Sequence, residues 1–596
     1  LNAEELAVGV LWGAEEALLK DVNMRFAGSH RDGSWRLSFT EFDAQWRDHY
    51  VDLAGISVWH PGNTLWRFTL PQLEVTATNA LLTESDILPE HLQNVLTDLA
   101  PEGYLNHIQF DLYAGEQGID SFALRAEASE LSVQAWQGAP GAEGLTGYLE
   151  ISPNHGILLV DSEALTLAFP HLYDDAFALK SVKTELRWEY DDQRVRLHSG
   201  LISAESFDRP MSAMLRLDLP LHKDASPDPT MTLMIGAQNV DASHHEAYTP
   251  KVLGDDLHAW LADSIREGRA SDVGFVYHGS LLADAEQRPS VQLDLTLADV
   301  ELRFLKEWPA LKAKSAAVLI NNAEVTAVSD AASLNGLVLG SLEVSVAPNS
   351  RGDFALNVAT SAKPIFPQLK SLLMDTPLHD YIGNTFDSWG GEGSATVDFG
   401  LHMLFAGELL PKVNVDADID FAVLDLPDYR LALSSASGHI HYDTERGLSS
   451  NNLRAKVFEQ VLLASIDQNG RQVEVDIATN VAAKDVELWL RSPVLQFFSG
   501  SSPIKLQIQA GGDTPNLTVT SELQGVGISL PQPFYKSAES RRQLTITMPL
   551  GGDEQILRLA LAEQLALNLG ISEGEVFGAH LRLGGSATEP LPRPLL

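Results

Sequence analysis

Ser290-Val-Gln-Leu-Asp-Leu-Thr-Leu297 is the stretch that decides the fold. Val291, Leu293, Leu295 and Leu297 alternate with polar residues, and a period of two is typical of a β-strand with one buried face. The same alternation recurs along the whole chain, in runs that stand beside Gly, Asn, Asp or Pro. The apolar positions of the other runs are Ile108, Phe110 and Leu112; Leu186, Trp188 and Tyr190; Leu215, Leu217, Leu219 and Leu221; Leu342, Val344 and Val346; Val473, Val475 and Ile477; Ile504, Leu506 and Ile508; and Leu544, Ile546, Met548 and Leu550.

The spacing between these runs sets the topology. Commonly 10 to 15 residues separate one run from the next, which leaves room for a turn and little else. Consecutive strands should therefore pair as antiparallel meanders. The pattern predicts an all-β fold, and it leaves two arrangements open: one very long twisted sheet, or several closed sandwiches in contact.

Helical periodicity is confined to short inserts. We expect helices near 255–268, 366–389 and 484–498, with Gly268 as the C-cap of the first, and another at 89–99. The N-terminal segment 4–19 is ambiguous between helix and strand. These few helices are expected to act as caps or inserts on a sheet.

No long linker divides the chain. The clearest loop contains Pro227 and Pro229, and a weaker seam follows at 239–250. We therefore expect a first β segment at 1–250 and a second at 251–596, within one continuous element.

Composition excludes several classes of function. The 596 residues include 41 Lys and Arg against 81 Asp and Glu, a formal net charge of −40 that disfavours nucleic acid as a partner. The chain has no cysteine, so disulfides, zinc–thiolate sites and cysteine nucleophiles are impossible. It contains no apolar run long enough to span a bilayer. Because it starts at Leu1 and ends in a proline-rich stretch, we expect a fragment of a longer protein.

Three motifs could carry chemistry. Gly570-Ile-Ser-Glu-Gly574 matches the nucleophile elbow, but a strand is expected after Ser572 where that motif needs a helix. His439-Ile-His441 and His244-His245 are the close histidine pairs, and a metal would need further ligands. For both pairs a solvated position is the stronger interpretation.

A third pattern is acidic. Asp416, Asp418 and Asp420 alternate along one predicted strand. A straight strand fans its carboxylates apart, whereas calcium needs convergent oxygen ligands. We expect these residues to mark a solvated edge strand.

From Pro101 onward the chain resembles a known family. The resemblance rests on Pro101-Glu-Gly-Tyr-Leu-Asn106, Phe122-Ala-Leu-Arg-Ala-Glu-Ala-Ser129, Leu145-Thr-Gly-Tyr-Leu-Glu150, Trp260-Leu-Ala-Asp263, and Thr520-Ser-Glu-Leu-Gln-Gly525 followed by Leu530-Pro-Gln-Pro533 and Lys536. Their order and spacing are similar to the YhdP family, AsmA-like bacterial envelope proteins related to TamB. The similarity covers most of residues 100–540.

The resemblance implies a fold and a function. It implies a protein that is anchored in the inner membrane by an N-terminal helix, which we expect to lie outside this sequence, and that crosses the periplasm as a long, twisted, mostly antiparallel sheet curled into an elongated open hydrophobic groove. Such a protein is expected to carry phospholipid between the inner and outer membranes and to maintain the outer-membrane barrier, without catalytic residues, metals or cofactors. The membranes would be reached through regions missing from this sequence, and we expect a monomer.

The groove would be lined by the alternating apolar positions given above, from Ile108 to Ile546. An acyl chain on such a face would leave water at about 0.8 kcal/mol per CH₂. Two alternatives stay open: a structural or adhesive envelope protein with closed sandwich cores, and a polysaccharide-acting enzyme with two carboxylates in a cleft.

Overall fold

The computed structural model describes residues 2–9, 16–46, 49–83, 90–115, 118–136, 139–191, 193–220, 228–282, 285–377, 379, 387–405, 411–510, 515–550, 554–572 and 575–584. Strands account for 66% of the structure and helices for 12%, which confirms the all-β prediction. The chain forms two compact units: unit 1 is 1–302 with 317–323, and unit 2 is 303–316 with 324–596. The seam expected near 250 falls among the short helices of unit 1.

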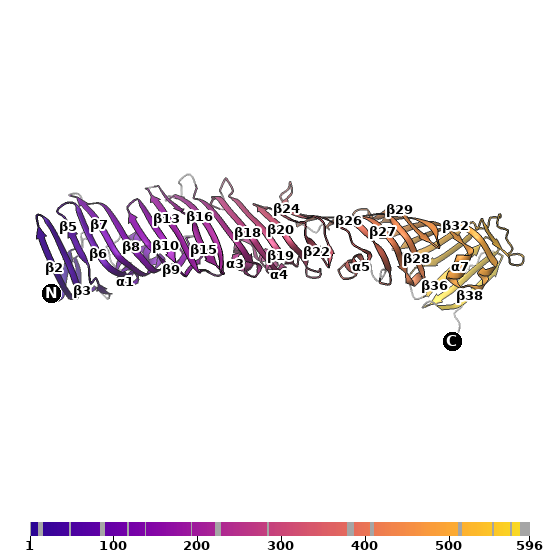
Figure 1. Cartoon of the computed structure of the whole chain (residues 1–596), viewed down its shortest axis with the longest axis horizontal. Helices are drawn as coiled ribbons and strands as arrows, with labels where there is room; N and C mark the ends of the chain where they lie inside the picture. Colours follow the sequence, from indigo (N-terminus) through magenta and orange to yellow (C-terminus); the bar gives the residue numbers. More distant parts are fainter. Residues whose placement is uncertain are drawn as a thin grey trace. The chain divides into compact units, whose positions relative to one another are not determined.

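Unit 1 is an antiparallel meander in which strands pair with their neighbours in the chain (Figure 1). Its strands are β1 (Asn2–Gly9), β2 (Glu16–Arg31), β3 (Ser34–Trp46), β4 (His49–Asp52), β5 (Ser57–His60), β6 (Leu65–Glu74), β7 (Glu102–Gly115), β8 (Gly118–Val133), β9 (Gly141–Ser152), β10 (His155–Ser162), β11 (Leu165–Ala168), β12 (Phe177–Leu179), β13 (Ser181–Tyr190), β14 (Arg194–Ser199), β15 (Ile202–Ser206), β16 (Arg209–Pro220), β17 (Thr230–Asp241), β18 (Ile265–Ser280) and β19 (Ser290–Leu302). The segment 4–19, ambiguous by sequence, contributes strand in β1 and β2.

Unit 2 repeats this arrangement. Its strands are β21 (Glu324–Ser329), β22 (Ala332–Leu334), β23 (Leu337–Val338), β24 (Leu342–Pro348), β25 (Phe354–Ala362), β26 (Gly390–Leu404), β27 (Lys412–Leu426), β28 (Leu431–Asp443), β29 (Gly447–Val457), β30 (Gln460–Asn469), β31 (Gln472–Ala482), β32 (Phe498–Ala510), β33 (Asn516–Ser521), β34 (Val526–Ile528), β35 (Leu544–Pro549), β36 (Glu554–Leu561), β37 (Leu565–Ser572) and β38 (Glu575–Leu583). Residues of β20 (Leu311–Asn321) fall in both units.

The helices of each unit lie at one edge of its sheet. In unit 1, α1 (Val75–Thr83) and α2 (Glu90–Leu99) join β6 to β7, while α3 (His245–Tyr248) and α4 (Asp255–Ser264) join β17 to β18 (Figure 1). In unit 2, α5 (Phe366–Met374) joins β25 to β26, and α7 (Ala483–Leu490) joins β31 to β32. An even number of passes across the sheet separates the two connections of a unit, so both lie at the same edge. We call the side of the sheet where these strand ends lie the helix edge, and the side where the opposite strand ends lie the open edge.

The predicted helix boundaries need correction. The helix expected to end at Gly268 ends at Ser264, and Gly268 lies within β18 at φ +144°. Here the pairing with β19 is irregular, so the glycine serves a bulge rather than a C-cap. The helix expected over 366–389 is observed as α5, and residues 378 and 380–386 lie outside the described residues.

Buried serines mark the places where strands break near the helix edge. Ser162, Ser199, Ser329 and Ser521 each end a strand, and after each of the first three a new short strand begins three residues later. The Ser162 hydroxyl accepts the amide of Thr146 at 2.8 Å, and Ser199 accepts that of Leu215 at 2.8 Å. The hydroxyl thus satisfies a main-chain group of the neighbouring strand where the ladder is interrupted. The break lets the sheet bend without leaving that group unpaired.

Candidate functional site

In unit 1 the register places the predicted apolar sets on one face. Directly paired residues of antiparallel strands share a face, so the ladder can be followed from strand to strand. It runs through Phe110, Leu124, Ile151, Gly156, Trp188, Leu197 and Leu217. Leu215 lies two residues from Leu217 on β16 and therefore on the same face. It pairs with Leu233, which pairs with Tyr277, and Tyr277 pairs with Val291. Four sets chosen from separate runs therefore form one apolar face.

In unit 2 the remaining sets also share one face. Val344 pairs with Val358, which pairs with Leu401. Farther along, the ladder runs through Ile466, Val475, Ile508, Leu517 and Met548. Leu342, Val346, Val473, Ile477, Ile504, Leu506, Leu544 and Ile546 lie on the same face, because each is an even number of residues from one of these along a regular strand. The lining candidates of each unit are thus brought together.

Most of these side chains are only half-buried. Ile108, Leu112 and Leu342 are buried, whereas the other described candidates retain partial exposure. Leu221 lies outside the described residues. Along β19, half-buried Val291, Leu293 and Leu295 alternate with exposed polar residues. A sandwich would bury the apolar positions fully under a second sheet. In each unit we call the half-buried part of this face the apolar band. It lies mainly toward the open edge, although Leu112, three residues from that end of β7, is buried.

Clusters of buried apolar residues lie toward the helix edge. Val160, Leu165, Leu179 and Val182 form one buried cluster around the break between β10 and β11. Leu523, Val526, Ile528 and Leu561 form another near the end of β33. These clusters stabilise the bent edge, while the band beyond them lacks such cover among the described residues.

Helix α5 packs directly on the apolar face of unit 2. The ring of Phe366 meets that of Phe421 edge-on, with centroids 5.4 Å apart. A Cβ atom on Gly391 would lie 2.9 Å from the Phe366 ring, so this glycine leaves the space that the ring fills. Lys370 Nζ donates to the carbonyl oxygens of Asp387 (2.7 Å) and Trp389 (2.8 Å). The helix is therefore held by one aromatic anchor and one lysine.

The opposite face of unit 1 carries a charged network. Asp111 is 2% exposed, and Arg67 donates to both its oxygens, at 2.6 and 2.8 Å. Burial acts to raise the pKa of Asp111, but hydrogen bonds from Arg67 and Gln109 hold that pKa below its ordinary value. The network is bidentate and structural, and it belongs to the face away from the apolar band.

On the face of unit 2 that is opposite its apolar residues, here called the outer face, the alternating aspartates meet the histidine pair. His441 Nδ1 lies 2.7 Å from Asp416 Oδ1, and His439 Nδ1 lies 2.9 Å from Asp418 Oδ1. The expected edge strand is therefore wrong: β27 pairs on both sides, with β26 and β28, and its carboxylates face the imidazoles of β28. Sequence spacing alone did not reveal this register.

The other motifs have structural roles. Ser572 ends β37, and strand β38 follows, so the helix of a nucleophile elbow is absent at this described position. His244 stacks on Phe207 with centroids 4.0 Å apart. No group of three or more metal-ligating side chains converges among the described residues. Within that part of the chain, no helix combines the length and apolarity needed to cross a bilayer.

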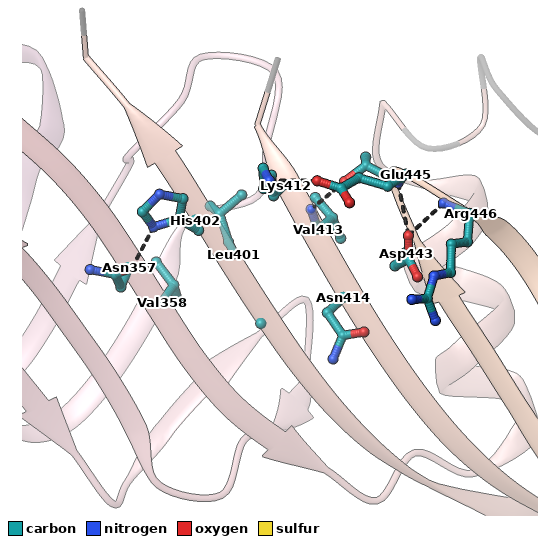
Figure 2. A pocket seen from close by; sticks show the side chains of 12 residues that line it. Asn357, Val358, Leu401, His402, Lys412, Val413, Asn414, Asp443, Glu445 and Arg446 are labelled. Atoms are coloured by element: carbon teal, nitrogen blue, oxygen red, sulfur yellow. Dashed lines mark hydrogen bonds and ion pairs between the residues drawn. The ribbon is translucent and has the colours of Figure 1, made fainter. Parts of the chain in front are cut away.

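A hollow of about 510 Å³ lies on the outer face at the open edge of unit 2 (Figure 2). Its polar lining comes from the ends of β25 to β28 and the turn after β28: Asn357, His402, Lys412, Asn414, Asp443, Thr444, Glu445 and Arg446. Lys412 forms an ion pair with Glu445, and His402 Nδ1 lies 2.7 Å from Asn357 Oδ1. The sequence alone does not reveal this site, because its residues are up to 89 positions apart in the chain and are brought together only by the strand register.

The buried serines were also missed. Their signal in the sequence is a serine that closes an alternating run and is followed by an acidic residue and then by two small or apolar residues, as in Ser162-Glu-Ala-Leu165 and Ser329-Asp-Ala-Ala332.

The sequence is similar to that of a known protein family over almost its whole length. The family model described as "YhdP protein" matches residues 4–595. Over 488 residues the chain is 22% identical to the intermembrane phospholipid transporter YhdP of Escherichia coli (strain K12), an alignment covering 79% of this chain and 37% of that protein. The chain thus spans little more than a third of the length of this relative. No solved structure matches significantly. With the family model matching almost its whole length, the chain belongs to the YhdP family.

Proposed function

We propose that this chain is a periplasmic conduit that carries phospholipid between the inner and outer membranes, with acyl chains held on the apolar band. The observation that carries the proposal is the band itself: apolar side chains in continuous register across successive strands, left half-buried. The relative's name, an intermembrane phospholipid transporter, supports the same cargo.

The physical chemistry of the band suits transfer. Each CH₂ group that leaves water gains about 0.8 kcal/mol, so the tails bind while the polar headgroup stays hydrated. Successive strands offer similar apolar area, so movement from one strand to the next changes the free energy little. Such transfer breaks no covalent bond, and the proposal assigns no catalytic residue.

The test compares the two faces of β19. Leu293→Asp with Leu295→Asp should reduce crosslinking of a photoreactive phospholipid severalfold, because buried charge opposes the tail. The matched control, Gln292→Ala with Asp294→Ala, changes exposed side chains of the same strand and should leave crosslinking unchanged.

A milder pair, Leu293→Asn with Leu295→Asn, guards against misfolding, and circular dichroism checks each variant. Equal losses from both faces, in variants that remain folded, would contradict a one-sided band.

A further inference from the structure

We propose that the hollow at the open edge of unit 2 binds a zwitterionic phospholipid headgroup, a phosphodiester that carries an ammonium group. This inference rests on the proposed function and adds a headgroup site to it. The cationic side chains of Lys412 and Arg446 and the imidazole of His402 would face the phosphate. The carboxylate of Glu445 would face the ammonium.

The charge balance of the hollow differs from that of the chain. Acidic residues outnumber basic ones 81 to 41 overall, yet the hollow holds two of each. One of its acids is already committed: Asp443 Oδ1 accepts the amides of Glu445 and Arg446, at 2.8 and 2.6 Å, and its Oδ2 lies 3.4 Å from His441 Nε2. Two cations and one anion are left to meet a ligand.

These three groups are accessible. Lys412 and Glu445 pair with each other, but their side chains are 65% and 69% exposed, so a ligand can separate them at small cost. Arg446 is exposed, and no ion pair joins its guanidinium to another residue drawn in Figure 2. Arginine suits a phosphate because its planar fork can donate two hydrogen bonds.

The floor of the hollow is open because of Gly400, which lies in register with Asn414 on the outer face. An added Cβ there would have no neighbour closer than 3.9 Å, so nothing fills this space. The amide of Asn414 and the imidazole of His402 flank it and can donate further hydrogen bonds.

The hollow is close enough to the apolar band for one lipid to contact both. Leu401 belongs to the band, while its neighbour His402 lies on the outer face. His402 is two residues from the end of β26, and Lys412 is the first residue of β27. At about 3.3 Å per residue, the polar groups lie within roughly 7 Å of the open edge. This distance is short enough for the headgroup of a lipid to reach the hollow while its tails contact the band.

The experiment uses tail-free probes, so that the band does not contribute. Glycerophosphoethanolamine, glycerophosphoglycerol and inorganic phosphate are titrated into the purified chain and followed by phosphorus NMR. We expect the ethanolamine probe to bind about fivefold more tightly than the glycerol probe, the difference made by one exposed ion pair. Arg446→Gln should weaken both about fivefold. Glu445→Lys should reverse the preference, because it replaces the group that meets the ammonium.

The matched control is Arg471→Gln, an exposed arginine in the turn between β30 and β31 that does not line the hollow. It should leave both affinities within about twofold. If Arg446→Gln and Glu445→Lys behave like this control, the headgroup site is wrong. Inorganic phosphate binding as tightly as the ethanolamine probe would also overturn it, in favour of a free-phosphate site.

Lipid crosslinking to β19 separates this inference from the proposed function. If lipid crosslinks to β19 but the hollow variants leave probe binding unchanged, only the headgroup site is wrong. Probe binding that responds to Arg446→Gln, without any crosslinked lipid, supports the hollow and overturns the conduit.

Discussion

At the residue scale, the imidazole of His441 lies between two carboxylates. Its Nδ1 faces Asp416 and its Nε2 faces Asp443, while His439 also approaches Asp416, at 3.3 Å. The hydrogen bond to Asp416 raises the pKa of His441 above its ordinary value, and the same bond lowers the pKa of Asp416. Both shifts favour the charged pair in the folded protein.

These pKa shifts determine how the stability of the fold depends on pH. The raised pKa of His441 stabilises the fold below the imidazole's unfolded pKa, and this contribution is lost as pH rises through the folded value. The Asp416 contribution is lost only in acid, as pH falls through its lowered pKa. We expect His441→Gln to lower the urea midpoint of unfolding more at pH 5.5 than at pH 8.5. Gln460→Ala, which removes an exposed, uncharged side chain at the start of β30, is the control and should show no such difference. A gap that grows with pH would contradict the pairing.

Lys536 is a buried lysine whose charged group is satisfied by backbone carbonyls. Its ammonium donates to the carbonyls of Leu523 (2.7 Å), Val526 (2.8 Å) and Ser537 (3.1 Å), and the residue is 2% exposed. Three acceptors match the three N–H groups of a lysine. Lys536, which is part of the family resemblance, therefore holds the segment after β33 in place through these hydrogen bonds.

At the element scale, α5 depends on the fit between Phe366 and Gly391. Phe366→Ala should destabilise unit 2 by about 3 kcal/mol, since it empties a buried aromatic site. Gly391→Ala should also destabilise it, by about 1–3 kcal/mol, because the new methyl group meets the ring and the carbonyl of Val423, both at 2.9 Å.

The double variant decides whether the two residues act together. Removing the ring relieves part of the methyl clash, so the combined effect should fall short of the sum by about 1 kcal/mol. Gly400→Ala, in the same strand but with open space around it, should be close to neutral. Chemical denaturation measures all four variants. Strict additivity would contradict the contact.

At the scale of the whole molecule, the meander sets how the protein unfolds. In each unit strands contact mainly their neighbours in sequence, so stability approaches a sum of local interfaces. We expect urea transitions followed by tryptophan fluorescence and by circular dichroism not to coincide. Phe366→Ala should lower hydrogen-exchange protection in β26 and β27 while leaving β7 and β8 unchanged. One coincident transition, with a global loss of protection, would contradict this expectation.

Alternation made much of the sheet predictable. The pleat sends successive side chains to opposite faces, so runs such as Val291 to Leu297 and Ile504 to Ile508 each identified a set that shares a face. Short spacings likewise led to antiparallel pairing of chain neighbours. Helix positions were recognisable from their period, but the end of α4 was misplaced, because a bulge glycine and a C-cap glycine look alike in sequence.

By itself, then, the sequence determined the all-β class, the apolar sets and the family, because strand alternation and motif order are local properties of the chain. Only the tertiary structure decided which part of the apolar face is dry and which forms the half-buried band. It also decided that Asp416 meets His441 and that Lys412, Glu445 and Arg446 border one hollow. The physical reason is register: bends at residues such as Ser162 and the pairing of distant strands set these neighbours, and no single run of residues contains that information.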